Sequence, residues 1–185
     1  HSYCCRGLFR NSKEWTYSHK AGQNEVVYKN CRNTENIAIT SMRPLGKDKK
    51  PKMFQGCVKG ASPDIHIASS EVDSLEYLNK VLKKLTDEKY EDIVILTCTT
   101  EDQSWLSAHC VNGSYPFNNR QIKFTSCRKF KGLEADAIIL VDVTRNTFDV
   151  GGNNLVFYVG ASRARFCLSI IVNMSDDACR FVSEI

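Results

Sequence analysis

The sequence lacks the long apolar runs and the leader pattern that would direct it into or across a membrane. No apolar run in the 185 residues reaches the length of a membrane-spanning helix. Residues 1–10 are polar and mixed, unlike a signal peptide. We therefore expect a cytoplasmic protein with no membrane partner. Residue 1 is His rather than Met, so we also expect a fragment or a processed product.

The cysteines and histidines lack the spacing of a disulfide framework or a zinc site. Nine cysteines occur, an odd number, and no two of them form a CxxC pair. The four histidines are scattered, with no pair at ligand spacing. Several cysteines lie inside apolar runs, which favours reduced and mostly buried thiols. The sequence predicts no metal site.

The chain also lacks the motifs with which a nucleotide-hydrolysing domain holds phosphate and metal. No GxxxxGK[ST] occurs, and Gly46-Lys47 has neither the first Gly nor the Ser or Thr. The acidic pair Asp87-Glu88 follows no apolar strand. No Gly-rich turn follows the first strand, which argues against an unrelated Rossmann-like or flavodoxin-like nucleotide enzyme.

The composition and the hydrophobic pattern indicate one globular α/β domain. Hydrophobic residues make up 42% and charged residues 25%, and the net charge of +4 permits a polyanionic partner without demanding one. Residues 1–24 show no periodicity and are expected to be an irregular lead-in or linker, whereas residues 25–185 form the domain. Apolar strands alternate with amphipathic helices, which predicts a mainly parallel sheet covered on both faces, with ligands at the carboxyl ends of its strands.

The expected elements follow from the apolar periodicity and from the turn residues. We expect strands at 25–29, 64–69, 92–98, 121–126, 137–143 and 166–172. We expect helices from Asn33-Thr34 to residue 42, from Ser70 to residue 85, over 101–110, over 153–164 and from residue 176. Residues 44–63 read as a loop, 112–116 as a turn, and Gly151-Gly152 as a break.

One segment with candidate binding chemistry runs from the polar strand end Thr125-Ser126 to Glu134. Arg128 follows the strand, then come Lys131-Gly132, the acid and an apolar strand. Hydroxyls and cations at a strand end can hold a phosphate backbone, and an acid can accept from a ribose hydroxyl. The ordinary alternative is a solvated turn.

Two arginines near helix ends are further candidates. Arg163 stands near the end of an apolar helix, on the predicted face of Val156 and Val159, and a buried guanidinium needs an anionic partner. Arg32 stands at a strand-to-helix junction, and a guanidinium suits multidentate phosphate contact. The ordinary alternatives are a salt bridge at a helix end and an exposed charge beside a helix cap.

In their order these segments resemble motifs of the UvrD/Rep/PcrA-type superfamily 1 helicases, over about residues 25–173. NCRNTENIA is similar to motif IV, FKGLEADAIILVDV to motif V, and FYVGASRARFCLSIIV to motif VI. VILTCTTEDQSWL also resembles the segment that precedes motif V. Only residues 111–120 separate Cys110 from the predicted strand at Gln121, so the chain resembles a compact form without the large accessory insertion.

The resemblance implies the second RecA-like motor domain, a three-layer α/β sandwich without its own phosphate-binding loop. ATP with Mg²⁺ would be held mainly by the first RecA-like domain of the full-length protein. Arg163 and Arg32 resemble the arginines that reach the γ-phosphate. Glu134, with Lys131 and Gly132, resembles the motif V segment near the nucleotide sugar.

The resemblance also implies that Thr125, Ser126 and Arg128 contact the backbone of single-stranded DNA. Arg128 stands where the family has His, which departs from its pattern. The isolated domain is expected to be inactive as an ATPase. The alternative is a RecA-like interaction or regulatory module without motor function.

Overall fold

The computed structural model describes residues 30, 32–46, 51–53, 55–148 and 153–173. The lead-in at 1–24, the strand at 25–29, the break at Gly151-Gly152 and the helix from residue 176 lie outside these residues. Within them, no helix has the length and apolar character needed to cross a bilayer.

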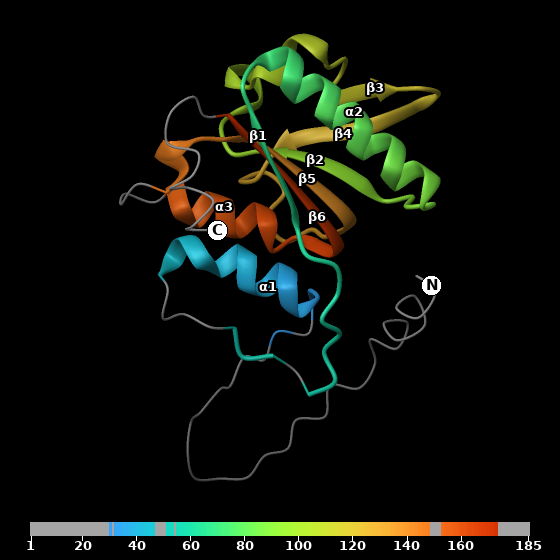
Figure 1. Ribbon diagram of the computed structural model, residues 1–185. Helices are drawn as coiled ribbons and strands as arrows, with labels where there is room; N and C mark the ends of the chain where they lie inside the picture. Colours follow the sequence, from blue (N-terminus) through green and yellow to red (C-terminus); the bar gives the residue numbers. More distant parts are fainter. Residues whose placement is uncertain (1–29, 31, 47–50, 54, 149–152, 174–185) are drawn as a thin grey trace.

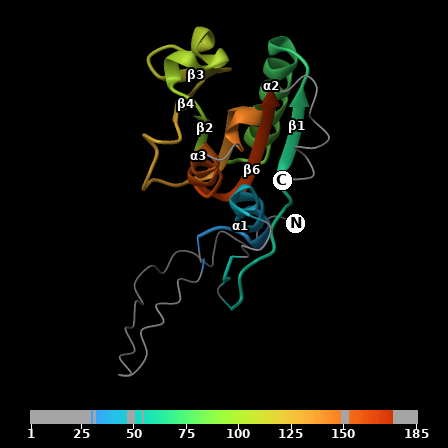
Figure 2. The ribbon, with the colours of Figure 1, turned by 90° about the vertical axis from the view of Figure 1, so that its left-hand side faces the viewer.

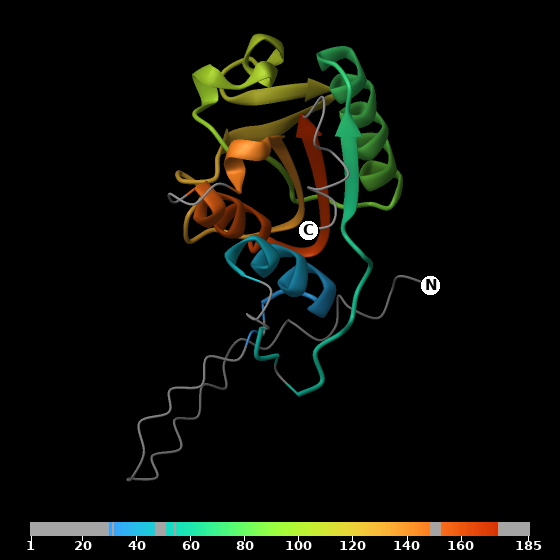
Figure 3. The ribbon, with the colours of Figure 1, turned by 60° about the vertical axis from the view of Figure 1, so that its left-hand side comes forward.

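A six-stranded sheet forms the middle of the domain, in the order β1-β6-β5-β2-β4-β3. All neighbouring strands are parallel except β3, which pairs antiparallel with β4 at one edge. Figure 3 shows β1 and β6 side by side and running in the same direction. The strands are β1 (Asp64–Ala68), β2 (Ile93–Thr97), β3 (Ser114–Phe117), β4 (Arg120–Ser126), β5 (Ala135–Val143) and β6 (Ala164–Asn173).

Helices cover both faces of this sheet and make three layers (Figure 1). Ile37 of α1 (Glu35–Met42) and Phe157 of α3 (Asn153–Ala161) pack on one face against β2, β5 and β6. Leu78 and Leu82 of α2 (Glu71–Asp87) pack on the other face. Figure 2, turned by 90°, shows α1 and α3 next to each other. The predicted α/β fold with a mainly parallel sheet is confirmed.

The helix beginning at Ser70 is confirmed with its cap, whereas the expected cap of α1 differs. Ser70 Oγ accepts from the Asp73 N–H at 3.1 Å. Thr34 is the N-cap residue of α1, but its side chain makes no capping hydrogen bond. The N–H groups of Glu35 and Asn36 donate instead to the carbonyls of Val58 and Lys59, in the loop that follows α1. Tertiary contacts therefore replace the local cap.

The expected helix over residues 101–110 is wrong. Two 3₁₀-helices, η2 (Glu101–Gln103) and η3 (Trp105–His109), meet at the extended residue Ser104. Ser104 Oγ donates to Asp142 Oδ2 at 2.6 Å and accepts from the Leu106 N–H. This tertiary bond holds Ser104 out of helical geometry and divides the segment in two.

The turn expected at residues 112–116 contains the start of an edge strand. The chain reverses at Asn112 and Gly113, both at positive φ, and β3 begins at Ser114. Pro116 lies in β3, exposed and opposite Gln121 of β4. A proline lacks an N–H but is tolerated on an edge strand, where no further strand needs that donor.

The end of α3 corrects the expected position of Arg163. The helix ends at Ala161 rather than 164, and β6 begins at Ala164 rather than 166. Arg163 therefore lies in the turn between helix and strand, beyond the helical face of Val156 and Val159. The short connection places its side chain at an edge of the sheet.

Candidate functional site

The predicted site residues fall into two groups at opposite edges of the sheet. Thr125 and Ser126 end β4, so they lie at the edge where the parallel strands have their carboxyl ends. Glu134 and Arg163 directly precede β5 and β6, at the edge where the strands have their amino ends. The expectation that ligands gather at the carboxyl edge therefore accounts for only the first group.

Arg32, Glu134 and Arg163 form an arginine cluster at the amino edge, although they come from three distant segments. The buried side chain of Asn33 brings them together, because its Nδ2 donates to the carbonyl of Ser162 at 2.9 Å and also to that of Ala164. These bonds fix the start of α1 to the α3–β6 turn. Arg32 is thereby placed beside the turn that carries Arg163.

A short turn orients Arg32 within the arginine cluster. The side-chain oxygen of Asn30 accepts from the Arg32 N–H at 3.0 Å and from the Asn33 N–H at 3.4 Å. Arg32 Nε forms an ion pair with Glu134 Oε1, and 43% of the Arg32 side chain remains exposed. Glu134, expected near a nucleotide sugar, is thus the partner of Arg32.

The half-buried Arg163 is held by uncharged groups. Its Nε donates to the Val159 carbonyl at 3.0 Å, and one terminal nitrogen donates to Ser162 Oγ at 3.4 Å. Among the described residues, Arg163 makes no ion pair. Burial and the neighbouring Arg32 lower the pKa of the Arg163 guanidinium, and Glu134 opposes this effect. One carboxylate thus lies beside two guanidinium groups, which leaves an excess of positive charge suited to an anion.

Arg165, two residues further along, shows how this chain neutralises a structural arginine. Its terminal nitrogen donates to Asp136 at 2.7 Å and lies 3.7 Å from an oxygen of Asp92. Arg165 therefore has two carboxylate partners, whereas the hydrogen-bond partners of Arg163 are a carbonyl and a hydroxyl.

The segment between β4 and β5 links the two groups of site residues. It runs as consecutive turns from the carboxyl edge to the amino edge, and its Cys127 and Phe130 are buried against the face covered by α3. Gly132 has φ of 92°, a conformation that L side chains rarely adopt. Lys131 and Glu134 on either side of this turn are exposed. The predicted site residues Lys131 and Gly132 therefore lie in the turn that directs the backbone to Glu134.

At the carboxyl edge, Glu101, Thr125, Ser126 and Lys129 form what we term the Glu101 cluster. Glu101 Oε1 accepts from Thr125 Oγ1 at 2.9 Å and from the Ser126 N–H at 3.0 Å. Glu101 Oε2 pairs with Lys129 Nζ at 2.9 Å. Arg128 is exposed, and within the described part of the chain its side chain makes no hydrogen bond or ion pair.

The sequence did not reveal Asn33 and Glu101. The motif NCRNT points to Arg32 as a candidate, whereas the sequence predicts only a helix cap at Asn33. Its partners lie 129 and 131 positions away in the chain. Glu101 lies between two strands whose ends are adjacent only in the folded sheet. The one local signal was its position after the strand end Thr97.

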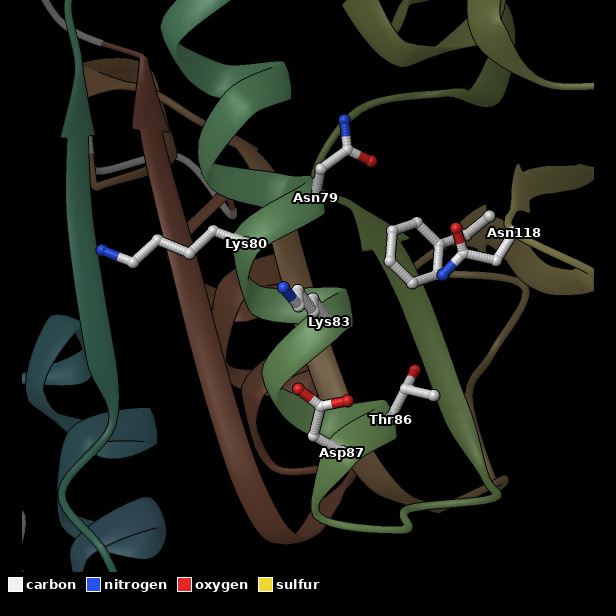
Figure 4. A pocket seen from close by; sticks show the side chains of 7 residues that line it. Asn79, Lys80, Lys83, Thr86, Asp87 and Asn118 are labelled. Atoms are coloured by element: carbon white, nitrogen blue, oxygen red, sulfur yellow. The ribbon is translucent and has the colours of Figure 1, made fainter.

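A separate hollow of about 580 Å³ lies away from both groups, between α2 and the β3–β4 hairpin (Figure 4). It is open and lined by residues such as Lys80, Lys83 and Asp87 of α2 and Phe117 of β3. No group of three His, Cys, Asp or Glu side chains suited to a metal ion occurs within the described ranges. The residues that line the hollow do not include any residue of the arginine cluster.

Comparison with known structures finds a similar fold at low sequence identity. The chain is similar to the C-terminal domain of a possible DNA helicase from Lactobacillus plantarum WCFS1, with a TM-score of 0.57 and 15% sequence identity. The match covers 77% of this chain and 86% of that domain. The fold is therefore RecA-like.

A second match is the structure of PRRSV helicase, of which this chain spans only 23%. The match covers 81% of this chain at 15% identity, with a TM-score of 0.35, which is too low to define a shared fold. No family model and no curated protein matches the sequence.

Proposed function

We propose that this chain is the second motor domain of an ATP-dependent DNA helicase of the UvrD/Rep/PcrA type. It completes an ATP site between two domains and contacts single-stranded DNA at its other edge. The main support for the proposal is that Arg32 and Arg163 come together at one partly exposed edge, where Glu134 is the one carboxylate among the described residues that acts on both. The RecA-like fold agrees with this role.

The arginine cluster fits the phosphates of ATP with Mg²⁺. The guanidinium donors of Arg163 are held by a carbonyl and a hydroxyl, which are weaker partners than an anion. ATP with Mg²⁺, held mainly by the first motor domain, supplies phosphate oxygens whose negative charge grows during hydrolysis. Arg163 and Arg32 then stabilise that charge, and they do so only when the two domains close.

The opposite edge supports the nucleic-acid role. Ser126 and Thr125 present an N–H and a hydroxyl at the end of β4, and Arg128 adds an exposed guanidinium. These groups contact a phosphate backbone without reading its bases. The segment from Ser126 to Glu134 joins this edge to the arginine cluster, so strand binding and domain closure share one piece of chain.

The chain alone is expected to show no ATP hydrolysis above background. It contains no phosphate-binding loop, and the described residues hold no metal ligand set. A steady-state phosphate-release assay on the purified 185-residue chain checks this. Robust turnover that co-purifies with the chain would refute the composite site. If arginine variants of the two-domain protein hydrolyse ATP normally, an interaction or regulatory module becomes the better interpretation.

Replacing Arg128 by alanine is expected to weaken oligo(dT) binding and to flatten its dependence on salt. Each lost phosphate contact on a single strand removes about 0.7 from the slope of log K against log salt concentration. Fluorescence anisotropy over a salt series measures the slope. Arg120→Ala is the matched control, because Arg120 is an exposed arginine at the other end of β4. Equal slopes for the two variants would remove Arg128 from the binding surface.

A further inference from the structure

The Glu101 carboxylate receives donors of three kinds at the carboxyl edge. A hydroxyl from Thr125, a backbone N–H from Ser126 and an ammonium from Lys129 all reach it within 2.9–3.0 Å. The first two belong to the end of β4 and the third to the turn that follows. Both carboxylate oxygens are engaged.

The same three donors would suit a phosphodiester. Phosphate oxygens in nucleic acids accept mainly from hydroxyls, backbone N–H groups and cationic side chains. The Glu101 cluster is open to solvent, since the Lys129 side chain is 71% exposed and that of Glu101 is 27% exposed. Arg128 and Lys131 are exposed in the same connection. A strand that passes over the end of β4 would therefore meet donors already occupied by an internal anion.

The fold holds the segment that carries Glu101 at both ends. Asp142 Oδ2 accepts from Thr97 Oγ1 and from Ser104 Oγ, both at 2.6 Å, on the two sides of Glu101 in the sequence. Burial alone would raise the pKa of the Glu101 carboxyl, but the hydrogen bonds from Lys129, Ser126 and Thr125 outweigh it and lower the pKa to about 2. The group is thus an anion at neutral pH. Its segment is held on both sides of Glu101, and its carboxylate is held by the three donors that a phosphate would use.

We propose that the Glu101 carboxylate takes the place of a nucleic-acid phosphate at the end of β4, so that a single strand must displace it to bind. This inference rests on the proposed nucleic-acid role of Thr125 and Ser126. It adds Lys129 to the phosphate-binding groups and makes Glu101 an internal competitor. The competition lowers the affinity of this edge for a strand, because the strand must first break the hydrogen bonds to Glu101.

The test compares oligo(dT) binding by Glu101→Ala and Asp102→Ala chains at one salt concentration. Asp102 is the neighbouring exposed carboxylate and has no hydrogen-bond or ion-pair partner among the described residues, so its removal changes the charge equally. Glu101→Ala is expected to tighten binding by about tenfold, because a phosphate no longer displaces charge-assisted hydrogen bonds. Asp102→Ala is expected to change it by less than about twofold, since it removes only a screened charge.

Two further variants keep the test decisive. Lys129→Ala should abolish the gain when added to Glu101→Ala, because it removes a donor that the phosphate would use. Glu101→Gln preserves side-chain shape and should show a smaller gain in the same direction, which guards against misfolding of the alanine variant. Equal gains for Glu101→Ala and Asp102→Ala, or no gain in either Glu101 variant, would overturn the proposal.

The Arg128→Ala measurement separates this proposal from the function on which it rests. If Arg128→Ala weakens binding but the Glu101 variants do not strengthen it beyond Asp102→Ala, strands bind at this edge without competition from Glu101. If neither Arg128 nor Glu101 affects binding, the nucleic-acid role of the edge fails, and the competition fails with it.

Discussion

Replacing Arg163 by alanine is expected to lower kcat for ATP hydrolysis by about 10³-fold or more in the proposed two-domain motor protein. The guanidinium has no carboxylate partner among the described residues and lies beside a second arginine. It is therefore available for the charge that develops on phosphate in the transition state. Single-turnover and steady-state ATPase measurements check the effect.

Arg120→Ala serves as the control for Arg163→Ala. Arg120 is an exposed arginine at the start of β4, which β2 separates from β5, and its guanidinium donates to the Tyr90 carbonyl at 3.3 Å. Its removal changes the net charge equally and should leave kcat within about twofold. Near-normal turnover of Arg163→Ala would make Arg163 a structural charge at the end of α3.

Replacing Asp142 by alanine is expected to destabilise the domain by about 2–4 kcal/mol. Its carboxylate accepts from Thr97 Oγ1 and Ser104 Oγ and from the Trp105 N–H, and it is buried. Alanine would leave those donors without their acceptor. It would also have to adopt the backbone φ of 56°, a left-handed conformation that is less favourable for alanine than for aspartate. Urea unfolding followed by circular dichroism measures the loss.

Asp142→Asn is the matched comparison for this stability change. Asparagine tolerates the left-handed conformation and keeps one acceptor oxygen, so it should lose less than half as much stability. Burial raises the pKa of the Asp142 carboxyl, against the hydrogen bonds from Ser104 and Thr97, so the charge itself carries a cost that asparagine removes. An alanine variant within about 0.5 kcal/mol of the wild type would contradict a structural role for this carboxylate.

Local sequence signals predicted most of the sheet and its covering helices. The strand over 92–98 is a continuous apolar run and forms the buried β2. The Ser70–Asp73 spacing predicted the start of α2, where the capping bond forms. These elements follow from periodicity and local capping, which nearby residues determine.

Elements that depend on distant partners could not be predicted in the same way. Ser104 interrupts the expected helix because its hydroxyl bonds to Asp142, 38 positions away. A distant hydrogen bond also shapes the site. The side chain of Asn33 donates to the carbonyl of Ser162, just beyond α3, and this bond places the neighbouring Arg32. The sequence named both arginines but not the residue that brings them together. It also gave no sign that Glu134 pairs with Arg32.

In the proposed motor, the two groups of site residues lie at opposite edges of the sheet and are connected by one segment of chain. Residues 126–134 join the carboxyl edge, where we propose the strand contacts, to the amino edge, where we propose the phosphate contacts. Two buried side chains, Cys127 and Phe130, hold that connection against the α3 face. In the proposed motor, a strand that moves this segment would act through these packed side chains on Glu134, the partner of Arg32.

A structure of the two-domain protein with ADP, Mg²⁺ and aluminium fluoride would show directly whether Arg32 and Arg163 complete an ATP site. We expect the guanidinium groups of Arg163 and Arg32 to lie within hydrogen-bond distance of the fluoride that replaces the transferred phosphate. Arg163 would then have exchanged the Val159 carbonyl for that anion. If Arg163 instead keeps its bond to Val159 and both arginines lie well away from the nucleotide, the composite ATP site does not exist.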